Sequence, residues 1–381
     1  MEERQTMKRN LFIFGIIFII FAVFFACSSP NELIDNPVDV EETIENNLTK
    51  LLDSVIAKTQ VPGLVAGIWV PDKEINFVYA TGVANFDNYS PMDENMLFRI
   101  GSITKTFTVT VLLELVDEGL IDLDDPLSKY LPDFPRGVEV TVEMLATMRS
   151  GIYNYTESEE FSFAMREDPE HFYLPKDLLA IAADNPYYFE PGTDFYYSNS
   201  NAIIIGKIIE MVTGNSLEKE IDSRIITPLD LTNTYYMTSR KEIPGFHPSA
   251  YYAGKYDPDF PECSEWLDCS WAGAAGCMVS DLFDLKKYVK ALVWGTLLSS
   301  ELQKYRLKTL EVSRSNIRYG LGILSYDDFY GHNGSYPGFS SIMMHSSQKN
   351  CTIIIWYNCH LNNSTPFMLL PEVINILYSD A

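Results

Sequence analysis

A serine followed three residues later by a lysine, at the start of an apolar run, constrains this chain more than any other feature. Residues 107–116 are mostly apolar and Gly119 follows them, a pattern typical of a buried helix that ends at a glycine. Ser102 then lies where the helix begins. Because residues three apart on a helix are neighbours, the pattern predicts that the Ser102 hydroxyl and the Lys105 amine are within hydrogen-bonding distance.

A serine–lysine pair of this kind can carry out nucleophilic catalysis. A serine hydroxyl is a weak nucleophile until a base accepts its proton, and a buried lysine with a lowered pKa is such a base. The N–H groups at the helix N-terminus can stabilise a developing oxyanion. The structural alternative makes Ser102 a helix cap and Lys105 a surface charge, although a cation in the first turn opposes the helix dipole. The same spacing recurs at Ser216 and Ser346, where we interpret it as a helix cap and a polar turn.

Two further motifs follow. Tyr197 and Asn199 precede an apolar run; a tyrosine beside a lysine can be a phenolate base or relay a proton, and Asn199 can offer its amide to both the lysine and a substrate. The alternative is a tyrosine packed on the core, with Asn199 capping the next helix.

Residues 330–339 are glycine-rich, so a ligand can approach the backbone, and we expect His332 to point its ring toward that ligand. The alternative is a hairpin turn with an exposed histidine.

The order of apolar patterns indicates an α+β fold. A helical pattern begins at residue 44, strand patterns lie at both ends of the chain, and helical patterns dominate from 102 to about 310. We therefore expect an antiparallel sheet built from both termini and flanked by helices, with an inserted, mainly helical region. The expected strands are residues 63–70, 75–80, 319–324, 339–344 and 352–357, and the expected final helix is 366–378.

The first residues are typical of an export signal. Basic residues precede sixteen apolar residues, 11–26, and the sequence Phe-Phe-Ala-Cys at Cys27 resembles a bacterial lipoprotein cleavage site. The alternative, an uncleaved anchor, is short of the roughly 20 residues that span a bilayer. We expect a signal peptide over 1–26, lipidation of Cys27, a tether over 27–43 and a domain over 44–381. The domain would then be held at the membrane, outside the cytoplasm.

Composition limits the partners. The net charge is −24 and basic residues form no cluster, so we expect no nucleic acid. The cysteines and histidines show no zinc-binding spacing. Cys263 and Cys269 flank a short polar loop, and whether they form a disulfide in an oxidising compartment stays open.

Taken in order, Ser102-x-x-Lys105, Tyr197-x-Asn199 and His332-x-Gly334 resemble the motifs of serine hydrolases related to class C β-lactamases. That family also includes D-alanyl-D-alanine carboxypeptidases, D-aminopeptidases and esterases. The resemblance runs from about residue 47 to the C-terminus and implies a fold like that of β-lactamases and penicillin-binding proteins. The stretches that accompany the motifs are residues 98–105, 191–199, 319–322 and 337–339.

The resemblance also implies a mechanism. Ser102 would attack a carbonyl and form an acyl-enzyme, Lys105 and Tyr197 would share proton transfer, and the N–H groups of Ser102 and Ser335 would form the oxyanion hole. Asn199, with the third motif, would bind a small-molecule or peptide substrate. Neither a metal nor an organic cofactor is expected.

One departure affects specificity. The third motif has His332 where β-lactamases of this family usually have a lysine, and a mostly neutral imidazole attracts a substrate carboxylate less than a permanent cation does. We therefore expect a hydrolase of an ester or amide, such as a D-amino-acid peptide, with a β-lactamase as the alternative. The alternative of another class is a non-catalytic lipoprotein that senses peptidoglycan. Such a sensor has no chemical need for Ser102, Lys105 and Tyr197 together.

Overall fold

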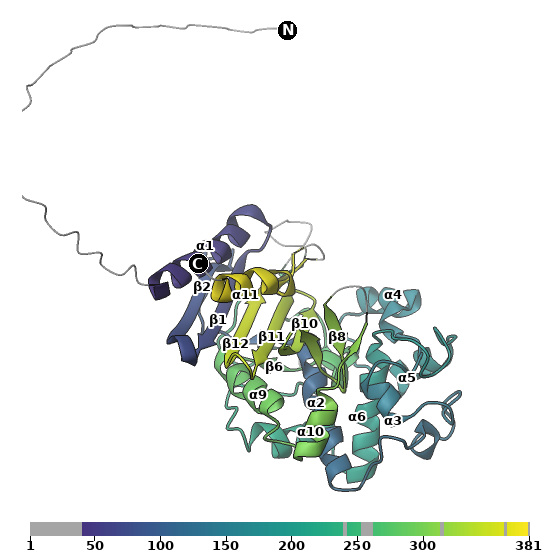
Figure 1. The fold of residues 1–381 in the computed structure, drawn as a ribbon. Helices are drawn as coiled ribbons and strands as arrows, with labels where there is room; N and C mark the ends of the chain where they lie inside the picture. Colours follow the sequence, from purple (N-terminus) through teal and green to yellow (C-terminus); the bar gives the residue numbers. More distant parts are fainter. Residues whose placement is uncertain (1–39, 239–241, 253–261, 313–315, 362–363, 380–381) are drawn as a thin grey trace, which may run out of the picture. The chain divides into compact units, whose positions relative to one another are not determined.

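The computed structural model describes residues 40–238, 242–252, 262–312, 316–361 and 364–379, which belong to one compact unit (Figure 1). Cys27, the expected signal peptide and most of the expected tether lie outside these residues. Within them, no helix combines the length and the apolar character that crossing a bilayer requires.

An antiparallel sheet, nine-stranded within the described residues, forms the centre of the fold. The N-terminal strands β1–β3 and the C-terminal strands β7–β12 meet where β1 pairs with β12, so the sheet is built from both termini as expected. Across the sheet the order is β3 (Ser90–Pro91), β2 (Ile75–Asn85), β1 (Gly63–Val70), β12 (Cys351–Tyr357), β11 (Phe339–Ser346), β10 (Phe329–Tyr336), β9 (Leu324–Tyr326), β8 (Ile317–Tyr319) and β7 (Leu310–Glu311). Two short pairs lie outside it: β4 (Phe98–Arg99) with β6 (Val279–Ser280), and β5 (Tyr251–Tyr252) with β13 (Cys359–His360).

Helices cover both faces of this sheet (Figure 1). Alternate residues of a strand point to opposite faces. Leu64 and Ile68 of β1 therefore pack with α1 and α11, while Val65 and Trp69 join the cluster that contains α2, α6 and α9. The described helices are α1 (Val40–Lys58), α2 (Thr104–Asp117), α3 (Val142–Ala146), α4 (Glu159–Glu167), α5 (Pro175–Ala183), α6 (Asn199–Thr213), α7 (Leu217–Ile221), α8 (Gly273–Gly276), α9 (Leu282–Trp294), α10 (Ser300–Arg306) and α11 (Leu370–Tyr378).

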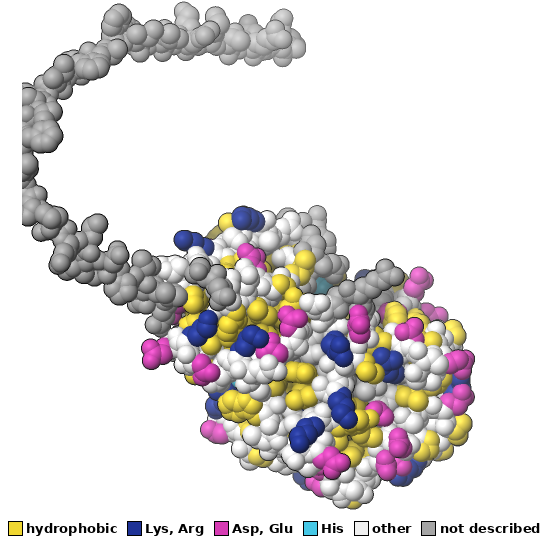
Figure 2. Space-filling view, in the orientation of Figure 1, with side chains coloured by type: hydrophobic (Ala, Val, Ile, Leu, Met, Phe, Trp, Pro, Cys, Tyr) yellow, Lys and Arg dark blue, Asp and Glu magenta, His cyan; other side chains and the backbone are white. Residues whose placement is uncertain are grey.

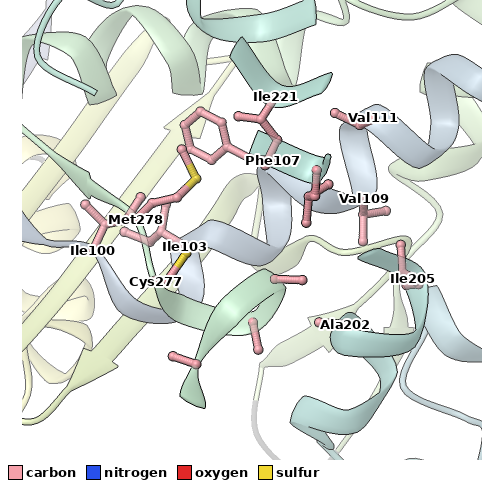
Figure 3. Packing of buried hydrophobic residues seen from close by; sticks show 14 of the residues in the cluster. Ile100, Ile103, Phe107, Val109, Val111, Ala202, Ile205, Ile221, Cys277 and Met278 are labelled. Carbon is pink, nitrogen blue, oxygen red and sulfur yellow. The ribbon is translucent and has the colours of Figure 1, made fainter. Parts of the chain in front are cut away.

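Helix α2 is the central helix of the inserted region. Its residues from Thr104 to Leu113 are all buried, and a helix that is buried on every side must be surrounded by other elements. Figure 3 shows Phe107 and Val109 of α2 among side chains of α6 and α7 and the segment after α8. The expected helix after Ser102 is therefore confirmed.

Two stretches differ from what the sequence patterns indicated, and glycine explains both. The strand expected over residues 319–324 is a turn between β8 and β9, because Gly322 has φ of +59°, which an extended strand cannot accommodate. The glycine-rich stretch 330–339, for which no strand was predicted, forms most of β10 and the hairpin turn to β11. Its glycines permit close packing: a Cβ on Gly331 would lie 1.9 Å from the Met343 carbonyl oxygen.

On the face of the molecule in Figure 2, lysine and arginine side chains are scattered among acidic and apolar ones. This face presents no continuous basic surface of the kind that nucleic-acid backbones bind.

Candidate active site

Ser102 lies in a single 3₁₀ turn, Gly101–Ile103, which leads directly into α2. Buried Ile100 and Ile103 anchor this turn in the core. Gly101 has φ of +51°, and a Cβ there would lie 2.5 Å from the Ser335 carbonyl oxygen. Glycine at position 101 therefore lets strand β10 pack directly against the turn that carries Ser102.

The expected serine–lysine contact is present: Lys105 Nζ lies 3.0 Å from Ser102 Oγ and 2.8 Å from the Ala275 carbonyl oxygen, to which it donates. Lys105 is fully buried, and burial lowers its pKa well below the ordinary value for lysine. Among the residues described, no carboxylate forms an ion pair with it. A neutral amine next to the hydroxyl is the form that accepts a proton from Ser102.

Tyr197 lies just before α6, and Lys105 Nζ is 4.9 Å from the centre of its ring. Its hydroxyl oxygen is buried and makes no hydrogen bond of standard geometry within the described residues. Burial raises the pKa of the phenol above its ordinary value, and the Ser102 side chain offsets this only in part. Tyr197 is therefore protonated, which favours the proton relay over the phenolate base among the two roles considered from the sequence.

Asn199 is the first residue of α6, and the loop after α3 holds it in place. Its Nδ2 donates to Thr156 Oγ1 at 3.1 Å, and its backbone N–H donates to Asn154 Oδ1 at 3.1 Å. Ser198 occupies the N-cap position, so the alternative in which Asn199 caps the helix is not what the structure shows. The amide nitrogen that we expected to serve Lys105 or a substrate is bonded to Thr156 instead.

Strand β10 forms the opposite wall of the site. Gly334 lies against the turn before Ser102, where a Cβ would be 2.0 Å from the Ile100 carbonyl oxygen. The Ser335 side chain is exposed, and its Oγ lies 2.8 Å from His360 Nδ1, a contact that sequence patterns did not indicate. Since the Ser335 backbone packs against Gly101, the N–H groups expected to form the oxyanion hole come from neighbouring segments.

His332, in contrast, does not face an open space. Its side chain is 1% exposed, and its Nε2 lies 3.2 Å from the Tyr319 hydroxyl, a second residue that the sequence did not single out. Burial lowers the pKa of His332 to about 3, so the imidazole is neutral at physiological pH. The expectation that this ring is directed at a ligand is therefore not what the structure shows.

Cys263 and Cys269 are not joined to each other, and both are buried. Cys263 Sγ lies 3.5 Å from the Ala250 carbonyl oxygen, and Cys269 Sγ lies 2.8 Å from that of Met237. In the described part of the chain, no group of three or more histidine, cysteine, aspartate or glutamate side chains is arranged to hold a metal ion.

Comparisons with known proteins identify the family and the fold. The model of the Beta-lactamase family matches residues 44–373. The crystal structure of a D-stereospecific amidohydrolase from Streptomyces sp. is 31% identical, with a TM-score of 0.78 over 90% of this chain and 99% of that one. A D-amino acid amidase from Ochrobactrum anthropi SV3, complexed with L-phenylalanine, is 26% identical, with a TM-score of 0.76 over 87% of this chain and 97% of that one. The putative penicillin-binding protein PbpX of Bacillus subtilis (strain 168) is 27% identical over 302 residues, 78% of this chain and 70% of the relative.

Proposed function

Because this chain belongs to the Beta-lactamase family and is a serine hydrolase, we propose that it cleaves an amide or ester bond of a D-amino-acid derivative through an acyl-enzyme on Ser102. The observation that carries this proposal is the 3.0 Å contact between Ser102 Oγ and the amine of a fully buried Lys105. The fold places this pair at the start of α2, next to a protonated Tyr197.

Acylation uses these three side chains. Ser102 Oγ attacks the substrate carbonyl carbon while its proton passes to the neutral amine of Lys105. The carbonyl oxygen becomes an oxyanion, which the N–H groups of Ser102 and Ser335 stabilise. When the tetrahedral intermediate collapses, the Tyr197 hydroxyl donates a proton to the leaving amine or alcohol and regains one from Lys105. This returns the amine to its neutral form and leaves the acyl group on Ser102.

Deacylation reverses these roles. A water molecule attacks the ester carbon, and Lys105, directly or through Tyr197, accepts its proton. The C–O bond to Ser102 then breaks, and Ser102 Oγ takes the proton back. The products are a carboxylic acid and the free enzyme.

The substrate class is inferred from relatives and from the third motif. Of the two solved relatives described above, one is named a D-stereospecific amidohydrolase and the other a D-amino acid amidase. A β-lactam substrate carries a carboxylate, and the buried, neutral His332 offers it no charge. Amides and esters of D-amino acids therefore fit this site better than β-lactams.

A labelling experiment tests the nucleophile. The full chain in detergent is treated with a fluorescent fluorophosphonate, and intact mass and peptide mapping locate the label. We expect one label on Ser102, which Ser102→Ala abolishes. Ser216→Ala is the matched control, because Ser216 has the same spacing to a lysine but its side chain caps α7 by accepting a hydrogen bond from the Lys219 N–H. Absence of label from the wild type would refute the proposal.

The substrate class needs a separate measurement. Hydrolysis of D-phenylalanine amide and D-alanine p-nitroanilide is compared with that of the L-isomers and of p-nitrophenyl acetate. We expect a higher kcat/KM for the D-isomers. Equal rates for both isomers, with faster turnover of the acetate, would refute the D-amino-acid assignment and favour an esterase.

We also propose that the enzyme acts outside the cytoplasm as a lipoprotein, on the basis of the apolar run before Cys27. Expression in a bacterial host with labelled palmitate should give a labelled product in the membrane fraction. In Cys27→Ala the label should be lost. Equal labelling of both proteins would refute lipidation at this cysteine.

A further inference from the structure

The wall behind the catalytic tyrosine contains a buried hydrogen bond to which the proposed mechanism gives no role. The Tyr319 hydroxyl lies 3.2 Å from His332 Nε2, and the other ring nitrogen of His332 lies 2.6 Å from the Asn333 carbonyl oxygen. Tyr319 is 3% exposed and His332 is 1% exposed. Both side chains face Tyr197, with each of their ring centres 6.0 Å from the centre of its ring.

The partners of His332 determine which of its nitrogens carries the proton. A carbonyl oxygen only accepts hydrogen bonds, so Nδ1 must be protonated to bond to Asn333. A neutral imidazole has one N–H, and Nε2 is therefore an acceptor. Tyr319, whose phenol burial keeps protonated, donates to it. Both nitrogens of His332 are thus used within the protein, and neither is left for a substrate.

We propose that Tyr319 is a positioning residue: it holds His332 as the neutral Nδ1–H tautomer, and the two rings together fix Tyr197 beside Lys105. This inference rests on the proposed role of Tyr197 in proton transfer. It gives the histidine of the third motif a structural task in place of substrate binding. The titratable groups that face His332 are Lys105 from α2, Tyr197 from the segment before α6 and Tyr319 from β8.

The turn that follows Tyr319 is itself fixed against the core. A Cβ on Gly320 would lie 2.6 Å from the Arg306 carbonyl oxygen, and one on Gly322 would lie 2.5 Å from the Cβ of Val109 in α2. The Gly322 N–H also donates to the Ala146 carbonyl oxygen at 2.9 Å. The turn after Tyr319 therefore packs against the helix that carries Lys105, so the Tyr319 hydroxyl has a defined position relative to the base.

Tyr319→Phe tests this role because it removes only the hydroxyl. We expect kcat to fall about fivefold, the factor that corresponds to one typical net hydrogen bond, with KM within about twofold. Loss of the donor to Nε2 removes a bond that favours neutral His332. The kcat of the variant should therefore decline at an acidic pH at which the wild type is still active, because protonated His332 displaces Tyr197.

Tyr288→Phe is the matched control. Tyr288 is also fully buried, and its hydroxyl bonds to Thr106 Oγ1 at 3.0 Å within the core, so this variant reports the general cost of losing a buried phenolic hydroxyl. Equal kcat and equal pH profiles for Tyr319→Phe and Tyr288→Phe would overturn the proposal. A larger loss of kcat together with an acid limb in Tyr319→Phe alone would support it.

A spectroscopic readout separates this proposal from the proposed function. Long-range ¹H–¹⁵N spectra of the full chain in detergent, labelled at histidine, distinguish the two tautomers, and His332→Gln identifies the signal. We expect the Nδ1–H form in the wild type and a change of tautomer or protonation in Tyr319→Phe. An Nε2–H form in the wild type would refute the inference even if Ser102 is labelled. A correct tautomer without labelling of Ser102 would refute the hydrolase instead.

Discussion

Lys105→Met separates the acid–base role of the lysine from its packing. The variant keeps an unbranched apolar side chain of similar length and removes the amine, which lies 3.0 Å from Ser102 Oγ and 2.8 Å from the Ala275 carbonyl oxygen. Without a general base we expect kcat/KM to fall by about 10²–10⁴. A loss of activity alone would not prove that the amine is neutral, so the dependence of stability on pH is the sharper measurement.

The direction in which the free energy of unfolding changes with pH depends on which state of the protein binds the proton. The unfolded chain protonates this lysine below about pH 10.4, whereas burial lowers its pKa in the folded protein. Between these two pKa values the unfolded state binds one more proton than the folded state. The free energy of unfolding of the wild type therefore rises with pH by up to about 1.4 kcal/mol per pH unit relative to Lys105→Met, which lacks the group.

Urea denaturation followed by tryptophan fluorescence, at several pH values from 7 to 10, measures this difference. We expect Lys105→Met to gain stability relative to the wild type at pH 7 and to lose that advantage as the pH rises. Lys219→Met is the matched control, since Lys219 belongs to another Ser-x-x-Lys but is exposed, and it reports what the loss of a surface lysine does to stability over the same pH range. A pH-independent difference for Lys105→Met would mean that Lys105 stays charged when folded, and the mechanism would then lack its base.

Two further variants test the surroundings of Ser102. Gly101→Ala should reduce kcat by about 10²–10³, because its Cβ would lie 2.5 Å from the Ser335 carbonyl oxygen and would push β10 and its oxyanion-hole N–H away. Gly119→Ala, also at positive φ but with open space around the added Cβ, controls for backbone strain, and equal kcat in both variants would contradict the prediction. Tyr197→Phe removes a buried hydroxyl that makes no hydrogen bond of standard geometry among the described residues, so turnover should fall about 100-fold while urea denaturation shows little change in stability. A clear loss of stability would show that the hydroxyl has a structural bond instead.

Patterns in the sequence predicted the sheet well where strands are buried on both faces. Strand β1 (Gly63–Val70) was predicted to the residue, because a continuous apolar run bounded by Pro62 and Pro71 admits few alternatives. Strand β10 was not predicted, because its glycines interrupt the apolar pattern of a strand. Glycine is needed in this strand because the Met343 and Ile100 carbonyl oxygens, from neighbouring segments, leave no space for side chains. The local sequence does not contain that information.

In the site, likewise, the contact between residues close in sequence was predicted and the contacts between distant residues were not. The contact between Ser102 and Lys105 follows from helical spacing, so it could be foreseen. The contacts of Tyr319 with His332 and of His360 with Ser335 join residues 13 and 25 positions apart, and they depend on how strands of the folded chain are brought together. The only sequence signal for Tyr319 was the Tyr-Gly-Leu-Gly stretch, whose glycines fix the turn after it.

The chemistry of this site depends on the packing of the whole inserted region. A nearby cation would lower the pKa of Lys105, but His332, the basic side chain of the third motif, is buried and neutral. Burial therefore lowers the pKa of Lys105, which lies fully buried at the start of α2, and Figure 3 shows the apolar side chains that surround this helix. Water that reached the amine would stabilise its charged form and remove the base. The apolar run that first identified the helix is thus a requirement of catalysis as well as of folding.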